Sequence, residues 1–280
     1  MAKRKAESAG DIAGAKKTKG ETQVHEDVRG SIRKEKLVEY TNALPIQEFR
    51  SRFVDQDMLS YTSHQKGSDQ EEAFDISLVA ADWLTPGEHN ASFGLVEETS
   101  RPDYESSTFG WHPPRKRKEM LEPEMKYFFV RRKDAKPDVE RRKCGDVDKG
   151  ILGFLSCMIT HDSSPSVPVL YIYEIHLAES LRGLGLGKHL MLLADRLAKN
   201  IGLDKVMLTC FLCNEKAHRF YTSHGFGKDV CSPEDRRTRN KIVPVDYVIM
   251  SKDVVRKTTK EDIVGFGDSG DERSESTCRI

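Results

Sequence analysis

The segment from Glu174 to Lys188, EIHLAESLRGLGLGK, combines the residue types that bind phosphate groups. An apolar strand pattern runs into a glycine-rich loop, and a helical pattern follows at once. Glycines let a backbone approach a ligand closely, and the first amides of a helix are unpaired and lie at its positive end. Phosphate or pyrophosphate binds at such a place, and Arg182 and Lys188 add positive charge.

The spacing of the glycines excludes two common nucleotide sites. A Rossmann fingerprint needs Gly-x-Gly-x-x-Gly, whereas the glycines here are Gly183, Gly185 and Gly187. A P-loop needs Ser or Thr after its lysine, and this chain has a histidine there. The pattern that fits is Arg-x-x-Gly-x-Gly, which begins at Arg182.

Alternating strands and helices must position this loop. Apolar and β-branched runs predict strands over 73–80, 126–131, 150–160, 169–177, 206–212 and 242–251. Pro113-Pro114 is expected to separate two helical segments. Helices are predicted over 91–107, 115–121, 184–202 and 214–223. The third of these carries one apolar stripe, formed by Leu186, Leu190, Leu193 and Leu197. The order predicts an α/β layered domain around a mixed central sheet.

Composition narrows the class of protein. The 280 residues are 32% charged and 37% apolar, too polar for a fully folded chain of this length. Lys plus Arg equals Asp plus Glu at 45 each, which argues against direct nucleic-acid binding by the whole domain. No apolar run could span a bilayer and no secretory signal is visible, so we expect neither a membrane protein nor a secreted one. The six cysteines are expected to be reduced and intracellular.

Four regions follow from these patterns. Residues 1–30 are expected to be a disordered basic tail, and its clusters Lys3–Lys5 and Lys16–Lys19 fit either a nuclear-import signal or a solubilising tail. Residues 31–72 are expected to be a helical or irregular extension, 73–252 the folded domain, and 253–280 a polar disordered tail.

The Arg-x-x-Gly-x-Gly motif resembles the pyrophosphate-binding motif of the GCN5-related N-acetyltransferases (GNAT), which use acetyl-CoA. Over about 74–251 the chain is similar to the NatD-type histone N-alpha-acetyltransferases, on four stretches: Tyr104–Trp111 with the basic run after it, Tyr171–Glu174, Val206–Thr209 and Asn214–Ala217. This resemblance implies a GNAT fold and acetyl transfer from acetyl-CoA to the free amino terminus of histone 4 and histone 2A, whose tails begin Ser-Gly-Arg-Gly. It also implies a protein of nucleus and cytoplasm, associated with ribosomes or chromatin.

The same resemblance assigns the binding residues. The pantetheine arm of acetyl-CoA would meet backbone groups of Ile175, His176 and Leu177. The pyrophosphate would be held by Arg182, Gly183, Leu184, Gly185, Leu186, Gly187 and Lys188, with Asn214 near the reactive end. The peptide pocket would be lined by Tyr104, Trp111, Tyr173, Thr209 and Tyr247, with Asp162 pairing the substrate arginine. The chain departs from the family at Phe109, at Ser164, where the family has a second acid, and in a longer loop before Gly150.

Two residues are predicted to be catalytic. Glu174 lies in an apolar strand, where a carboxylate needs a partner or a task. It is the candidate base, directly or through a water, because an α-amino group with a pKa near 7.7–8.0 needs only a modest one. A structural ion pair is the alternative. Strand alternation places Tyr171, Tyr173 and Ile175 on one face and Ile172, Glu174 and His176 on the other. Tyr247 either protonates the leaving thiolate, orders the substrate or is simply a core residue.

Other readings stay open. The acceptor could be a lysine side chain or a small amine, or the chain could be an inactive module that binds histone tails. Cys210 and Cys213 form a C-x-x-C, but residues three apart on a strand point to opposite faces, so we predict no metal site. The basic run 115–118 is interpreted as a solvated helix face.

Overall fold

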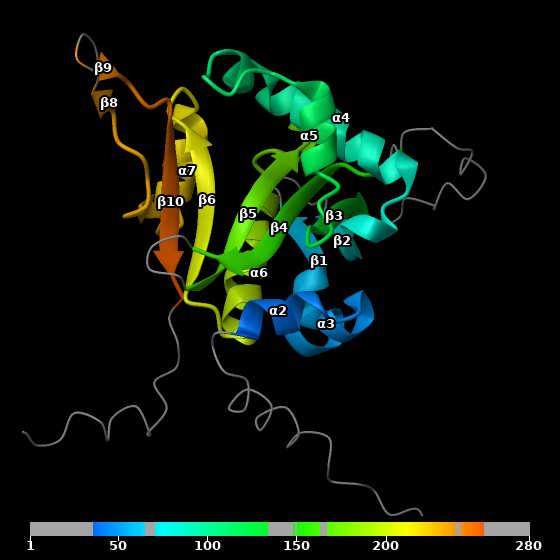
Figure 1. The fold of residues 1–280 in the computed structure, drawn as a ribbon. Helices are drawn as coiled ribbons and strands as arrows, with labels where there is room; N and C mark the ends of the chain where they lie inside the picture. The colour runs from blue at the N-terminus through cyan, green and yellow to red at the C-terminus, as the bar shows by residue number, and fades with distance from the viewer. Residues whose placement is uncertain are drawn as a thin grey trace, which may run out of the picture.

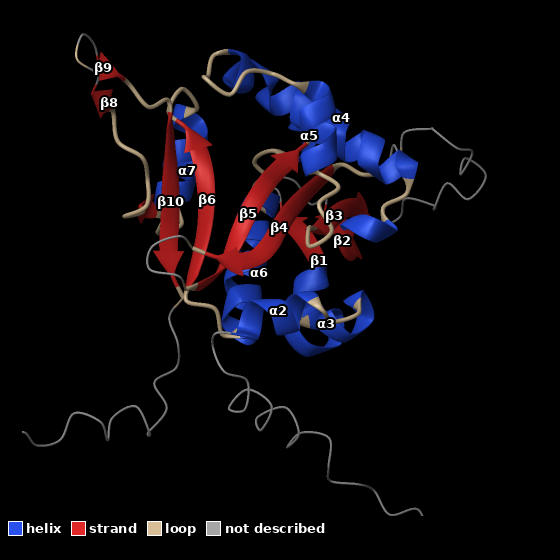
Figure 2. Ribbon diagram, in the orientation of Figure 1, coloured by secondary structure: helices blue, strands red, loops and turns tan. Residues whose placement is uncertain are grey.

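The computed structural model describes residues 36–64, 71–133, 148, 150–162, 167–237, 239 and 242–254. The predictions for residues 1–30, for most of the 132–149 loop, for Ser164 and for all but the start of the 253–280 tail lie outside these residues. An eight-stranded sheet in the order β1-β2-β3-β4-β5-β6-β10-β7 forms the centre of the molecule, and helices cover both of its faces (Figures 1 and 2). None of the described helices has the length and apolar character needed to cross a bilayer.

The element bounds follow the predicted order closely. The strands are β1 Ser60–His64, β2 Glu71–Ala80, β3 Lys126–Arg132, β4 Gly153–His161, β5 Pro168–Leu177, β6 Lys205–Phe211, β7 Gly227–Lys228 and β10 Tyr247–Asp253. A separate two-stranded ribbon pairs β8 Arg236–Arg237 with β9 Ile242–Val243. The helices are α2 Leu37–Asn42, α3 Ile46–Phe53, α4 Pro86–Glu105, α5 Pro113–Glu119, α6 Leu186–Ile201 and α7 Glu215–Ser223, and three short 3-10 turns are η2 Gln56–Leu59, η3 Ala81–Trp83 and η5 Glu179–Leu181.

Two apolar clusters hold the layers together. The leucine stripe predicted for α6 is fully buried and packs with α2, α3 and one face of the sheet. On the opposite face, α4 packs through Phe93 and Val96 against Tyr127, Phe129 and Phe154. Burying a Leu or Phe side chain contributes about 1.5–3 kcal/mol, so these two clusters supply most of the packing energy.

Helices α4 and α5 both begin earlier than predicted, and proline is the reason. Thr85 and Glu88 form a capping box at the start of α4, with Pro86 at the first helical position. Pro113 and Pro114 occupy the first turn of α5, where the missing N–H costs nothing, so they start a helix rather than break one.

Strands β5 and β6 are parallel, and their pairing ends early. The last paired residues are Ile172 and Leu208, although both strands continue beyond them. Figure 1 shows the two strands diverging from that point. The backbone edge of β5 after Ile172 therefore faces a gap rather than another strand.

A β-bulge at Tyr173 corrects the predicted alternation. Ser156 on β4 pairs with Glu174, but the next residue of β4 pairs with Ile172, so Tyr173 is the extra residue. Ile172 consequently packs in the α6-side cluster, while His176 bonds to α4. The prediction that Ile172 shares a face with Glu174 is wrong, and so is the prediction that Ile175 shares one with Tyr171, because the bulge reverses the alternation and both isoleucines pack toward the α6-side cluster.

The sheet differs from the prediction near both of its edges. The predicted strand over 242–251 is split into β9 and β10 around Pro244, which cannot donate a ladder hydrogen bond. At the other edge, the extension contributes β1, which pairs antiparallel with β2. The predicted boundary at residue 73 therefore falls within a strand of the sheet.

We predict that Gly153→Ala destabilises the fold by about 1–3 kcal/mol. A methyl group there would lie 2.5 Å from Leu177 Cδ2 and 2.8 Å from the His176 carbonyl oxygen. Denaturant unfolding measures the change. Gly94→Ala is the matched control, because nothing lies within 4 Å of the added atom and alanine favours a helix by up to about 1 kcal/mol. Equal stability of wild type and Gly153→Ala would contradict the prediction.

Candidate active site

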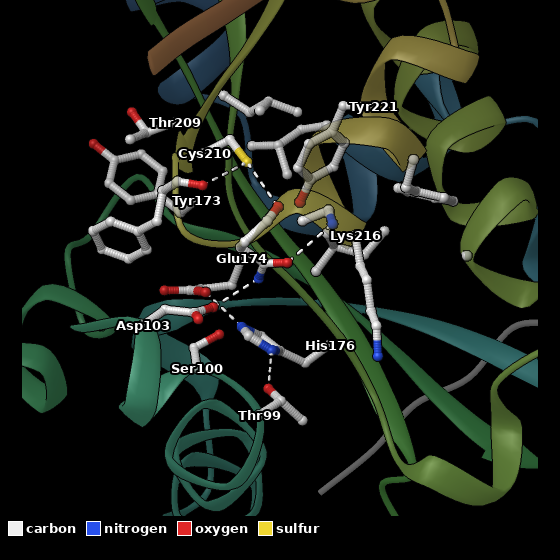
Figure 3. Close-up of a pocket in the computed structure, with 18 of the residues that line it drawn as sticks. Thr99, Ser100, Asp103, Tyr173, Glu174, His176, Thr209, Cys210, Lys216 and Tyr221 are labelled. Atoms are coloured by element: carbon white, nitrogen blue, oxygen red, sulfur yellow. Dashed lines mark hydrogen bonds and ion pairs between the residues drawn. The ribbon is translucent and has the colours of Figure 1, made fainter. Parts of the chain in front are cut away.

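A cavity of about 970 Å³ opens where β5 and β6 diverge. Its walls come from α4, β5, β6 and α7 (Figure 3). At one end lie Arg182, Gly183 and Gly187 of the glycine-rich loop, and at the other Tyr104, Phe109 and Tyr173. The cavity therefore connects the predicted phosphate loop with the predicted peptide pocket.

The glycine-rich loop has the geometry of an anion site. Gly183 and Gly185 have φ of 80° and 88°, a region that side chains rarely adopt. The first hydrogen bond of α6 runs from the His189 amide to the Gly185 carbonyl, so the three amides before it have no partner within the helix. Arg182 and Lys188 are exposed, and no described carboxylate forms an ion pair with either.

Tyr61 on β1 braces this loop from behind, a contact that the sequence did not predict. Its hydroxyl donates to the Leu184 carbonyl at 2.7 Å, and its ring lies 4.9 Å from that of His189. A Cβ on Gly185 would come within 2.3 Å of the Tyr61 hydroxyl. The loop is thus held by both its own backbone conformation and an element 123 residues away.

The unpaired edge of β5 suits an extended ligand. Ile175, His176 and Leu177 still pair with β4 on one side. Their other edge faces the cavity beyond the last residue pair with β6. Polar backbone groups on such an edge need partners, and the amides of a pantetheine arm offer them.

Glu174 is the centre of a buried polar network at the floor of the cavity. One carboxylate oxygen pairs with Lys116 Nζ from α5, and the other accepts from His176 Nε2 at 2.5 Å. His176 Nδ1 lies 2.5 Å from the hydroxyl of Thr99 on α4 (Figure 3). Glu174 is only 9% exposed, so three elements contribute to one desolvated cluster.

The partners decide the charge of Glu174. Burial alone would raise the pKa of its carboxyl group, but the charge of Lys116 and the contact with His176 outweigh burial and lower the pKa to about 2. Lys116 responds in the opposite sense: burial lowers its pKa, and the neighbouring carboxylates raise it well above the usual value. Both groups are therefore charged at neutral pH.

Several predicted peptide residues meet at the cavity. Tyr104, Tyr173 and Thr209, which the resemblance assigns to peptide binding, line it. Burial raises the pKa of Tyr171 to about 12, and its hydroxyl bonds to Thr209 at 2.5 Å, so Tyr171 belongs to the same wall. Trp111 lies behind this wall, with its ring 5.5 Å from that of Tyr104, and does not line the cavity.

The other two predicted peptide residues lie elsewhere. Tyr247 lines a separate hollow, although its ring lies 5.1 Å from that of Phe109 on the cavity rim. Asp162 directly follows β4, at the end of that strand farther from Glu174. It is buried and accepts a hydrogen bond from Lys205 Nζ at 2.7 Å. The structure thus does not bring Asp162 to the cavity with the rest.

Helix α7 contributes one predicted and one unpredicted residue. Asn214 caps the helix by accepting from the Ala217 amide at 2.9 Å, and it donates to Asp103 at 2.7 Å, so both ends of its side-chain amide are engaged. Tyr221 lines the cavity on the same helix (Figure 3). Burial and the nearby Cys210 and Glu174 raise its pKa well above the usual value, so its phenol stays protonated.

The two cysteines of the C-x-x-C differ in exposure. Cys210 is buried and Cys213 exposed, and neither belongs to a metal-like group among the described residues. Ligand atoms of Asp162, Asp229 and Cys231 do lie within 4.8 Å of one another, but Lys205 Nζ already pairs with both carboxylates.

The expectation that 115–118 is a solvated helix face is wrong at Lys116, which is 6% exposed.

Comparison with known proteins shows which families and proteins this chain is similar to. The acetyltransferase (GNAT) family matches residues 95–226. N-alpha-acetyltransferase 40 of Saccharomyces cerevisiae is 34% identical over 125 residues, which are 35% of this chain and 44% of the yeast protein. The chain thus spans less than half the length of this curated relative.

Two solved structures are similar at low identity. Arabidopsis thaliana NAA60, in complex with a bisubstrate analogue, is 15% identical with a TM-score of 0.42, covering 64% of this chain and 99% of that one. The ribosomal-protein-S18-alanine N-acetyltransferase of Escherichia coli is 12% identical with a TM-score of 0.41, covering 66% and 97%. The family match, with the sheet and helix order described above, confirms the predicted mixed α/β GNAT fold. Acetyltransferases of the GNAT family use acetyl-CoA.

We predict that Tyr61→Phe weakens acetyl-CoA binding about 5-fold, the equivalent of one hydrogen bond of about 1 kcal/mol. The loop would lose the bond that fixes the Leu184 carbonyl. Titration calorimetry measures the dissociation constant. Tyr40→Phe is the control, because its hydroxyl bonds to Arg52 on α3, away from the loop. An unchanged affinity in Tyr61→Phe would show that the loop needs no brace.

Proposed function

We propose that this protein is an N-alpha-acetyltransferase that uses acetyl-CoA. The single observation that carries the proposal is the cavity that joins the anion-binding loop to the Glu174 network through the opening between β5 and β6. The similarity to a yeast N-alpha-acetyltransferase over part of the chain supports the same activity.

The described residues fit acetyl-CoA. The amides at the start of α6, with Arg182 and Lys188, would hold the pyrophosphate. The free edge of β5 would pair with the pantetheine arm. When bound, acetyl-CoA supplies an acetyl group activated as a thioester.

The transfer forms a bond between the substrate nitrogen and the acetyl carbon and breaks the bond from that carbon to sulfur. A neutral α-amino group is already well populated near its pKa of about 7.7–8.0. Glu174, held as an anion, orients the amine or a water between them and accepts the hydrogen bond through which the amine proton leaves to water. Its lowered pKa suits this orienting role better than lasting proton storage.

Tyr221 is our candidate for the acid that protonates the leaving thiolate. Its hydroxyl lines the cavity and remains protonated at physiological pH. Tyr247, the candidate from sequence, lines a different hollow, which favours Tyr221 for this task.

The tails of histone 4 and histone 2A remain our proposed substrates, and their residues Ser-Gly-Arg-Gly suit the mouth of the cavity. Tyr173 is 37% exposed there. Burial raises its pKa, and so do the negative charges of Glu119, Glu122 and Glu124, which would attract a basic peptide. The aromatic rings of Tyr104, Phe109 and Phe211 pack against one another at the same opening. Such substrates fit a protein of nucleus and cytoplasm, at ribosomes or chromatin.

Two alternative functions remain distinguishable by chemistry. A lysine acceptor, with a pKa near 10.4, would need a stronger base than Glu174 provides. An inactive tail-binding module would have no use for an ionised carboxylate buried in the cavity that the glycine-rich loop also lines.

The test is acetyl transfer from acetyl-CoA to the peptide Ser-Gly-Arg-Gly-Lys and to a copy with a blocked amino terminus. We expect transfer to the free peptide alone, because its α-amino group is partly neutral near physiological pH, whereas the lysine amine of both peptides is almost fully protonated. Mass spectrometry locates the acetyl group. Transfer to both peptides would establish a lysine acceptor, and tight binding without transfer would establish a binding module.

A third peptide, Ser-Gly-Ala-Gly-Lys, tests the arginine preference. We expect kcat/KM to fall by about 10-fold, since a charge-assisted hydrogen bond contributes about 1.5–3 kcal/mol at most. Equal kcat/KM on both peptides would exclude recognition of the arginine.

We predict that Tyr221→Phe lowers kcat by about 10²-fold or more, with little change in KM for acetyl-CoA, because it removes a proton donor and keeps the ring. Tyr247→Phe serves as the comparison. A larger loss in Tyr247→Phe than in Tyr221→Phe would return the acid role to Tyr247.

A further inference from the structure

Lys116 differs from the other residues of its basic run. Arg115 and Lys118 are exposed, and Arg117 stacks over the Phe93 ring at 3.7 Å while donating to Asn90. Lys116 instead points inward and is 6% exposed. A lysine is almost never buried to this degree unless its charge is paired.

The partners of Lys116 are those of the candidate active site. Its ammonium pairs with Glu174, lies 2.5 Å from Glu119 Oε1, and sits 5.4 Å from the centre of the Tyr104 ring. All four residues line the same cavity. The ammonium therefore occupies the floor of the pocket, between the two carboxylates.

We propose that Lys116 is a positioning residue for acetyl transfer: it holds Glu174 as an anion in a fixed orientation, so that docking of α5 on β5 completes the site. This inference rests on the proposed acetyltransferase function. Lys116 acts through Glu174 and does not itself meet the reacting atoms.

The hydrogen-bond partners of Glu174 fix the orientation of its carboxylate. Its second oxygen is held by His176, which Thr99 orients in turn. A single buried carboxylate with one of two donors removed turns toward whatever donor remains or takes up a proton. The first change moves the oxygen that would meet the substrate amine, and the second removes its negative charge.

Every charged or titratable group that faces Glu174 enters the pH argument. From α5 these are Lys116 and Glu119, from β5 His176, from α4 Tyr104, from β3 Tyr127 and from α7 Tyr221. Burial raises the pKa of all three tyrosines, so they are neutral across the working range. Lys116 is therefore the permanent cation of this set, and without it burial favours the neutral form of Glu174.

The experiment compares Lys116→Met with Lys118→Met, which removes the same charge from the exposed side of the same helix. ¹³C NMR of the side-chain carboxyl, assigned by its loss in Glu174→Gln, reports the titration of Glu174 without any assay of activity. We expect the midpoint to move upward by about 1–3 pH units in Lys116→Met and to stay in place in Lys118→Met. An unmoved midpoint in Lys116→Met would overturn the proposal even in an active enzyme.

Kinetics supply the second readout. We expect kcat to fall about 10- to 100-fold in Lys116→Met, and the deficit to grow only as the pH is lowered toward the raised Glu174 midpoint, because Glu174 then becomes protonated. Glu174→Gln should lose about 10²- to 10⁴-fold, and adding Lys116→Met to it should cost little more. Independent, multiplying losses in the double variant would mean that Lys116 is merely structural.

Lys116→Arg provides for the case in which Lys116→Met unfolds. It retains the positive charge, so a Glu174 midpoint that stays low and a partial recovery of kcat are expected. If Lys116→Arg folds but its Glu174 midpoint rises as far as in Lys116→Met, the proposal is contradicted. Absence of acetyl transfer in the wild type would instead overturn the proposed function and leave the NMR result to decide the role of Lys116.

Discussion

The end of pairing between β5 and β6 is the constraint on which the rest of the structure depends. Up to Ile172 and Leu208 the two strands exchange hydrogen bonds, and beyond them the sheet opens. Each unpaired group on that edge would be costly if it stayed buried and unsatisfied. The opening is tolerated because it is a cavity, and the glycine-rich loop and Glu174 gather around it. The bulge at Tyr173 then sets which side chains of β5 enter it.

Charge is concentrated at this opening with little exposure to water. A buried ion pair stabilises a fold only weakly, since desolvation of both charges offsets their attraction. Lys116 and Glu174 are better understood as a fixed electrostatic environment, prepared before any ligand arrives. The surrounding apolar clusters, which include the leucines of α6 and Phe93 of α4, provide stability that offsets the cost of burying these charges.

Much of this could be read from the sequence, for identifiable reasons. The leucine stripe of α6 and the glycines after β5 are local patterns, and a local pattern survives folding. The bulge at Tyr173 could not be predicted, because it depends on how β4 pairs with β5. Nor could Lys116: four consecutive basic residues look alike, and only the docking of α5 selects the one that turns inward. Tyr61 was invisible for the same reason, as its partner lies on a distant segment.

The sheet extends past the region of family similarity on both sides. That region, 95–226, starts inside α4 and ends before β7, so it omits β1, β2 and β10. A recombinant fragment cut to those limits would leave β3 and β6 as bare edges, and such edges template aggregation. It would also sever Asp246, whose carboxylate holds the Thr108 turn between α4 and α5. The smallest fragment to express is therefore bounded by the outer strands of the sheet rather than by the limits of the family match.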